Sequence, residues 1–216
     1  MKSYKKVAEA FADDVIDGRR IVGNDIVDRC KRFRRDLSRE DLELRTHDAD
    51  FVINIIQSTL VHKQGETMDG EPLMGKPFIL QPWQIFVIYN LLGFFYKGTD
   101  ERRFKEAFIM MGRKNGKTAF DSRLRWGVSL LQSKSGSKCY IVANSLQQAL
   151  QSFEFLKFSI QYMGFDDEFR VRDNSFEHSI SCNLKDVACR GLGALHHGPG
   201  GTCVRLVTED PSSWPQ

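Results

Sequence analysis

Several kinds of feature are missing from this chain of 216 residues. No stretch is long and apolar enough to cross a membrane, and the N-terminal lysines are not followed by the apolar run of a signal peptide. Internal repeats and low-complexity tracts are absent. The net charge of +3 is too small for a strongly basic nucleic-acid coat. We therefore expect a globular chain with no membrane partner.

Paired cysteine motifs are missing too. The five cysteines include no Cys-x-x-Cys pair, and Cys182 and Cys189 are not spaced from histidine as in zinc sites. Reduced thiols in a cytoplasm are the simplest interpretation.

The chain has enough apolar residues for a core, with 41% hydrophobic content and 16 phenylalanines. Its pattern indicates a helical region at 1–62, a Gly- and Pro-rich linker at 63–80, an alternation of helices and strands at 81–186 and a Gly-rich tail at 187–216. In the alternating part we expect helices at 82–95, 117–132 and 145–163, and strands at 105–111, 138–143, 169–173 and 178–184. This order predicts an α/β fold, a partial P-loop NTPase parallel sheet preceded by an N-terminal helical region.

Two local patterns in the first region have simple interpretations. Ser38 precedes Glu40 and Asp41, which indicates a helix start. The basic cluster from Arg29 to Arg35 is flanked by acids. It predicts a solvated helix face, with a DNA or partner patch as the alternative.

The most informative segment follows the expected strand at 105–111 and reads Gly-Arg-Lys-Asn-Gly-Lys-Thr from Gly112 to Thr118. A buried strand that opens into a Gly-Lys-Thr turn and a helix is an arrangement that binds nucleotide phosphates. Gly116 lets backbone N–H groups turn inward, Lys117 reaches the β- and γ-phosphates, and the Thr118 hydroxyl ligates Mg²⁺. An ordinary basic loop is the alternative. The predicted cofactors are ATP and Mg²⁺, bound by Gly112, Arg113, Lys114, Asn115, Gly116, Lys117 and Thr118.

Met111 stands where such a loop usually has its first glycine. In this departure the segment resembles the ATPase motif of large terminase subunits from tailed bacteriophages, the motors that package DNA into procapsids. Upstream, the segment from Phe78 to Phe86 resembles the adenine-recognition motif of that family. There Gln84 would donate to and accept from the adenine edge, and Trp83 would stack on the base. Core packing is the alternative for this pair.

The resemblance extends from about residue 1 to about residue 186 and includes the segment Cys139–Ala149, where Asn144 would contact DNA or phosphate or would belong to a plain strand–helix unit. It implies that Arg113 acts on the transition state, with a solvent-exposed charge as the alternative, and that Lys114 faces solvent or DNA. The implied partners are double-stranded DNA, the phage portal protein, the small terminase subunit and further copies of the chain. The implied location is the cytoplasm of the bacterial host, and transiently the procapsid portal.

The tail departs from the family pattern, which has an apolar strand ending in Asp-Glu. The nearest candidate is the run from Val204, in which Glu209 would orient water and Asp210 would hold Mg²⁺, although Arg205 interrupts it. No segment predicts a nuclease domain. We expect a truncated or frameshifted chain with poor ATP turnover. A natural short protein, a non-hydrolysing nucleotide-binding remnant and a helicase-like translocase stay open.

Overall fold

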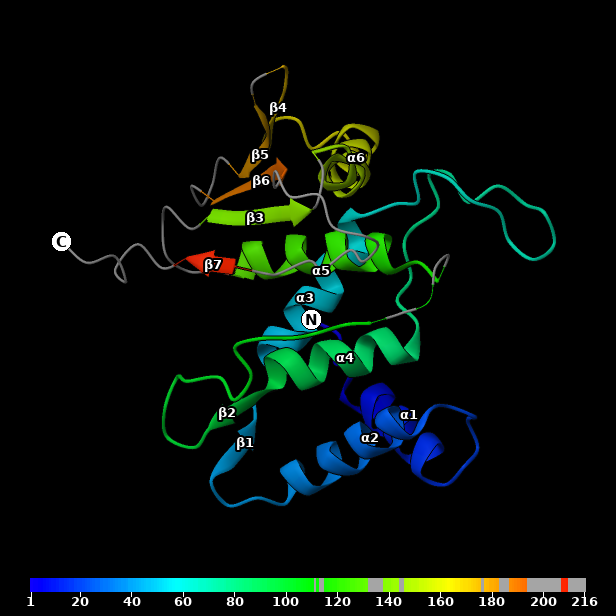
Figure 1. Ribbon diagram of the computed structural model, residues 1–216, viewed down its shortest axis with the longest axis vertical. Helices are drawn as coiled ribbons and strands as arrows, with labels where there is room; N and C mark the ends of the chain where they lie inside the picture. The colour runs from blue at the N-terminus through cyan, green and yellow to red at the C-terminus, as the bar shows by residue number, and fades with distance from the viewer. Residues whose placement is uncertain are drawn as a thin grey trace. The chain divides into compact units, whose positions relative to one another are not determined.

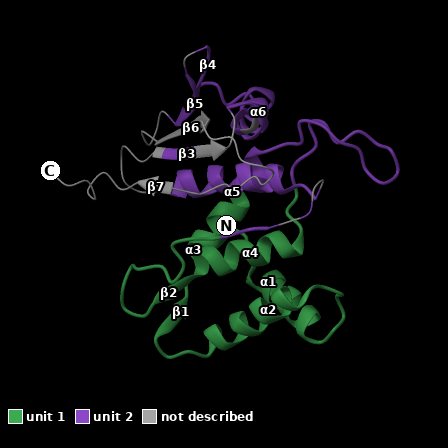
Figure 2. Ribbon diagram, viewed as in Figure 1, with its two compact units in different colours: residues 1–54, 79–107 green, residues 55–78, 108–216 purple. Residues whose placement is uncertain are grey.

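The computed structural model describes residues 1–110, 112, 115–131, 138–143, 146–175, 177–182, 187–193 and 207–209. For residues 138, 141–143, 148, 187–193 and 207–209 only the backbone is described. The chain forms two compact units, one of residues 1–54 and 79–107, the other of residues 55–78 and 108–216 (Figure 2). Residues 63–78 of the expected linker belong to the second unit, and residues 79–80 belong to the first.

Amphipathic helices surround an aromatic core in the first unit. The helices are α1 (Lys5–Ile16), α2 (Asn24–Leu37), the first part of α3 (Thr46–Thr59) and α4 (Pro82–Gly93), and the short antiparallel strands are β1 (Leu42–Leu44) and β2 (Phe94–Tyr96). Phe33 lies at the centre of the core, with its ring 5.3 Å from Phe86 and 5.5 Å from Phe94. Phe11 of α1 joins the cluster 5.1 Å from Phe86. These large rings bury the apolar face of each helix.

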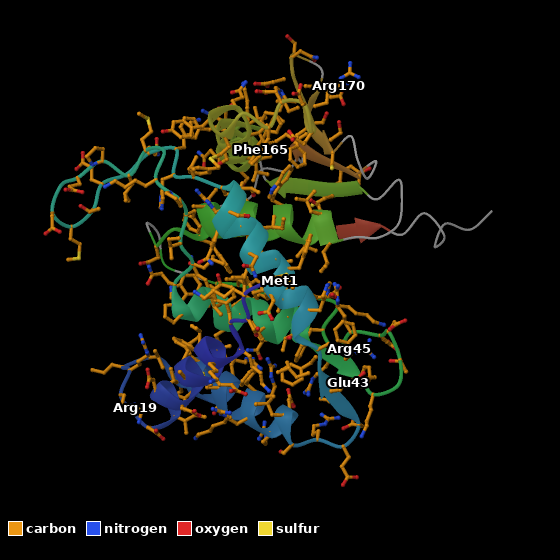
Figure 3. All side chains as sticks on the ribbon, turned by 180° about the vertical axis from the view of Figure 1, so that it is seen from behind. Met1, Arg19, Glu43, Arg45, Phe165 and Arg170 are labelled. Atoms are coloured by element: carbon orange, nitrogen blue, oxygen red, sulfur yellow. The ribbon has the colours of Figure 1, made fainter. Side chains whose placement is uncertain are left out.

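Charged groups cover the edges of this core. Arg45 follows β1 and donates from Nε to Glu43 at 2.8 Å, and its guanidinium lies 4.7 Å from the ring centroid of Phe95 (Figure 3). Deeper inside, Arg103 forms an ion pair with Asp36, whose side chain is only 2% exposed. Because Asp36 is held out of water, this pair is sensitive to the loss of either partner.

Helix α4 begins with a well-defined cap. Gln81 has an extended backbone (φ −72°, ψ 154°), and Pro82 occupies the first turn, where its missing N–H costs nothing. The side chain of Gln84 reaches back so that its Oε1 accepts the N–H of Gln81 at 2.8 Å. A polar residue at the N-cap and another three residues later, here Gln81 and Gln84, form the pattern of a capping box. This capping role of Gln84 was not predicted from the sequence.

The second unit combines two helices with a five-stranded sheet (Figure 1). Its elements are α5 (Lys117–Leu131), β3 (Lys138–Ala143), α6 (Leu146–Met163), β4 (Phe169–Asp173), β5 (His178–Cys182), β6 (Val187–Gly193) and β7 (Val207–Glu209). The strand order is β4-β5-β6-β3-β7. Among the described strands of this sheet, β3 and β6 are parallel, and the other neighbouring pairs are antiparallel. The fold is therefore α/β, and the parallel P-loop sheet is seen only in part.

The core of the second unit lies where α5 and α6 pack on each other and on β3 and β6. Phe120 of α5 and Phe153 of α6 are fully buried, and Trp126 contacts the Phe169 ring at 4.7 Å. These contacts fix α5 in place, and the first turn of α5 carries Lys117 and Thr118, the last two residues of the predicted phosphate site.

Some expected elements differ from those observed. Residues 105–110 form no strand, and Phe108 and Met110 are 80% and 81% exposed, because no neighbouring strand pairs with this apolar run among the described residues. Ser38 ends α2, with its hydroxyl donating to the carbonyl of Arg35, and it starts no helix. Residues 187–193, the start of the expected Gly-rich tail, form β6, which pairs with β3 on one edge and with β5 on the other.

Candidate nucleotide site

The predicted phosphate loop turns into α5 at Gly116. Gly116 has φ +74°, the left-handed conformation that glycine adopts with least strain. Its carbonyl accepts the N–H of Phe120 at 2.9 Å, so the helix begins immediately after it. Lys117 and Thr118 lie in the first turn and are half-buried. The first backbone N–H groups of a helix have no partner within the helix and carry a partial positive charge, which suits an anion.

The loop before the helix is exposed. Asn115 donates from Nδ2 to the carbonyl of Gly112 at 3.3 Å, which closes a short turn. A Cβ on Gly112 would lie 3.1 Å from that same Nδ2, so a larger residue would disturb the turn. Arg113 and Lys114, predicted to bind nucleotide, lie outside the described residues, as does Met111.

No acidic residue occupies the first turn of α5. The nearest carboxylate in the helix is Asp121, which binds Arg125 through Nε–Oδ2 and Nη2–Oδ1 contacts of 2.9 and 3.0 Å. Burial raises the pKa of the Asp121 carboxyl, and Arg125 and Lys117 oppose that shift. Arg125 also donates to the carbonyl of Tyr140 in β3 at 3.1 Å. The helix is thus joined to the sheet through Arg125.

The predicted base-reading residues are both in α4. Gln84 is 5% exposed, and one lone pair of Oε1 already accepts the N–H of Gln81. A carbonyl oxygen has a second lone pair, and the amide group also carries two N–H donors. Trp83 is half-buried in the first turn. The structure establishes the capping role of Gln84, and adenine recognition by the pair stays a prediction.

The acidic tail residues were predicted to orient water and to hold Mg²⁺. The β7 backbone pairs antiparallel with β3, with Glu209 opposite Lys138. Lys138 is the first residue of β3, whereas ligands of α/β sheets bind at the carboxyl ends of parallel strands. This backbone pairing does not support the predicted role of Glu209 in orienting water at the phosphate loop, and that role stays a prediction. Asp210, the predicted Mg²⁺ ligand, lies outside the described residues.

The donor groups fit a nucleotide phosphate better than they define a metal site. Thr118 offers a hydroxyl in the first turn, the position at which a phosphate loop ligates Mg²⁺. Within the described ranges, no group of three or more His, Cys, Asp or Glu side chains could hold a metal ion.

No helix in the described part of the chain is long and apolar enough to cross a membrane. Asn144, the other predicted contact residue, is not described.

Sequence reasoning missed the buried arginines of α5. Arg123 and Arg125 are 2% and 1% exposed, although arginine in an amphipathic helix usually faces water. For Arg125 a signal existed, because Asp121 stands four residues earlier on the same helix face. For Arg123 no local pattern was available, since its contacts with Val61 and Phe78 come from residues far away in the sequence.

Comparisons with known proteins identify one family. The family model described as "Terminase large subunit, ATPase domain" matches residues 82–192, just over half of the chain. The crystal structure of the HK97 bacteriophage large terminase matches with a TM-score of 0.52 and 18% identity, over 74% of this chain and 29% of that chain. At this identity the match shows a shared fold, and this chain spans less than a third of that protein. No curated protein matches.

Proposed function

Because the chain belongs to the family of terminase large subunits, through their ATPase domain, we propose that it binds ATP and Mg²⁺ at residues 112–118. The observation that carries this proposal is the turn at Gly116, with its positive φ, into a helix whose first turn holds Lys117 and Thr118 and no acid. Backbone N–H groups, a lysine and a hydroxyl at a helix N-terminus form a recurrent phosphate site.

Four residues of the loop have separate roles in this proposal. Lys117 contacts the β- and γ-phosphates, and the Thr118 hydroxyl holds Mg²⁺. Mg²⁺, when bound, neutralises charge on the phosphates. Arg113 stabilises the charge that develops during transfer of the γ-phosphoryl group, and Lys114 faces solvent or DNA. Trp83 and Gln84 of α4 contribute stacking and hydrogen bonds to adenine.

The wider activity follows from the family. We propose that the chain forms part of a phage motor that moves double-stranded DNA into procapsids, together with the portal protein, the small terminase subunit and further copies of itself. It would then act in the cytoplasm of the bacterial host and transiently at the procapsid portal. Membership of the ATPase-domain family supports this proposal.

Titration calorimetry with ATP tests the site. Lys117→Ala removes a charged hydrogen-bond donor to phosphate, and charged hydrogen bonds contribute about 1.5–3 kcal/mol, so the affinity should fall about tenfold or more. Lys76→Ala is the control, because Lys76 is an exposed lysine of the same unit that pairs with Glu71. Equal ATP affinity in Lys117→Ala and the control would refute the phosphate-loop assignment.

A second candidate function is nucleotide binding without turnover. It is favoured by the register that pairs Glu209 with the first residue of β3. A magnesium-dependent ATPase assay separates the two functions. Hydrolysis that disappears in Glu209→Gln would establish Glu209 as a catalytic carboxylate, whereas tight ATP binding with no hydrolysis would favour the binding module.

A further inference from the structure

The basic cluster of α2, in the first unit, contains a row of arginines along one side of the helix. Arg29, Arg32 and Arg35 are spaced three residues apart, and residues at this spacing are neighbours on a helix surface. Each of them stands one position before a buried residue of α2, so the row follows the border of the buried face. Arg29 and Arg35 are exposed, and Arg32 is half-buried. The helix therefore presents a line of guanidinium groups beside its packed face.

The acids near this row do not neutralise it. Asp36, a buried carboxylate near the end of α2, forms its ion pair with Arg103. Asp28 stands four residues before Arg32, a spacing at which a helix allows an ion pair, but the two side chains do not pair. Among the described residues, no ion pair involves an arginine of the row. Its positive charge is therefore available to an anion from outside the unit.

The surroundings of Arg32 restrict its movement. Its guanidinium lies 4.7 Å from the ring centroid of Phe104, and the guanidinium of Arg103 lies 5.0 Å from the same centroid. Nε of Arg32 is buried and has no hydrogen-bond partner among the described residues. Burial, and next the charge of Arg29, lower the pKa of Arg32. The ring thus holds a cation where other cations repel it, and a bound anion would relieve that repulsion.

Phosphate groups of a nucleic-acid backbone fit this row. Guanidinium groups bind phosphate through pairs of N–H donors. The six residues from Arg29 to Arg35 rise about 9 Å along the helix, and one strand of duplex DNA advances about 3.4 Å per phosphate, so the row spans about three phosphates. The whole chain has a net charge of only +3, so this density of positive charge is a local feature and does not follow from a basic composition.

We propose that Arg29, Arg32 and Arg35 form a surface that binds the phosphate backbone of double-stranded DNA without regard to base sequence. Phe104 is a positioning residue, which holds Arg32 at this surface. The proposal rests on the DNA-moving function proposed above, and it names a part of the first unit that contacts the DNA. Residues 112–118 take no part in it.

Fluorescence anisotropy with a labelled duplex of random sequence tests the surface. Each phosphate contact that is lost should reduce the slope of log K against log salt by about 0.9. Arg29→Gln and Arg35→Gln, at exposed positions, should each lower the affinity about threefold and reduce the slope. Arg32→Gln should act in the same direction, and Phe104→Leu should lower the affinity because the ring no longer holds Arg32. Asp28→Asn removes an acid beside the row and should raise the affinity.

Arg19→Gln is the control, because Arg19 is an exposed arginine of the same unit that pairs with Asp14 and Asp17 (Figure 3). It removes the same charge and should leave the affinity and the salt slope nearly unchanged. Equal weakening in Arg19→Gln and in the variants of the row would show an effect of net charge alone and would overturn the proposal. Unchanged binding in the variants of the row would overturn it too, as would binding to anionic phospholipid vesicles but not to the duplex.

Titration calorimetry with ATP separates this surface from the nucleotide site. Arg29→Gln and Arg35→Gln should bind ATP as the unaltered chain does, whereas Lys117→Ala should lose ATP affinity and keep its affinity for the duplex. Binding of the duplex without binding of ATP would refute only the nucleotide site, and binding of ATP without binding of the duplex would refute only the surface. If circular dichroism shows that Arg32→Gln does not fold, Arg29→Gln and Arg35→Gln decide the question.

Discussion

Replacement of Gln84 separates a structural role from a functional one on the same side chain. In Gln84→Ala the N–H of Gln81 loses the Oε1 acceptor that lies 2.8 Å away. Loss of a helix cap costs about 1 kcal/mol, and a donor left unpaired in a buried place costs about 1–3 kcal/mol. Since Gln84 is 5% exposed and Gln81 is exposed, water can replace part of the bond. We expect a loss of about 1–2 kcal/mol in the free energy of unfolding.

Gln84→Glu keeps the cap and removes the amide donor. A carboxylate oxygen can accept the N–H of Gln81 as Oε1 does, and glutamate at this position is typical of a capping box. A negative charge is also favourable in the first turn of a helix. The carboxylate cannot donate to adenine. Gln84→Glu should therefore keep most of the stability and lose the preference for ATP over GTP.

Urea unfolding followed by circular dichroism measures the first effect, and calorimetric titration with ATP and GTP measures the second. One lost hydrogen bond of about 0.5–1.5 kcal/mol predicts a change of about two- to tenfold in the ATP-to-GTP affinity ratio. An equal change for both nucleotides in both variants would show that Gln84 serves only the cap. Full stability in Gln84→Ala would refute the capping argument.

Two further predictions concern charged groups away from the nucleotide site. Asp36→Ala leaves Arg103 without its carboxylate in a place where the Asp36 side chain was 2% exposed, and breaking such a pair should lower the free energy of unfolding by about 3 kcal/mol, measured in urea. Hydrogen bonds from Lys157 and His178 hold the pKa of Asp173 below its ordinary value of 3.8. Its contribution to stability is therefore present above that value and is lost as the pH falls through the lower folded pKa, so stability should depend less on pH in Asp173→Asn in acid titrations. Identical acid titrations of the two proteins would contradict this assignment.

Local patterns were sufficient to predict the main elements of the second unit. The structure contains β3, α5 and α6 where we expected a strand at 138–143 and helices at 117–132 and 145–163. These elements could be predicted because an apolar run or a helical period can be seen in consecutive residues. The strand expected at 105–111 is absent from residues 105–110, since an apolar run forms a strand only where another strand offers its backbone groups. The pairing of β6 with β3 joins residues about fifty positions apart and has no local signal.

The residues of the candidate site also divide into those that the sequence predicts and those that it does not. Gly116, Lys117 and Thr118 could be predicted, because a phosphate loop is a contiguous segment whose function depends on the backbone turn. The burial of Gln84 and its bond to Gln81 also had a local signal, the four-residue spacing of the cap. Arg123 could not be predicted, because its partners Val61 and Phe78 come from a segment that precedes it by more than forty residues.

The two buried arginines of α5 show why one helix can serve more than one contact. Arg125 is compensated by Asp121 and donates to a carbonyl of β3, so it fixes α5 to the sheet at little electrostatic cost. Among the described residues, Arg123 contacts carbonyls and aromatic rings and pairs with no carboxylate, a more costly arrangement that joins α5 to Val61 and Phe78. Both act on the helix whose first turn holds Lys117. Arg125 and Arg123 therefore join the helix that begins at Lys117 to two different parts of its own unit, the sheet and the segment that contains Val61 and Phe78.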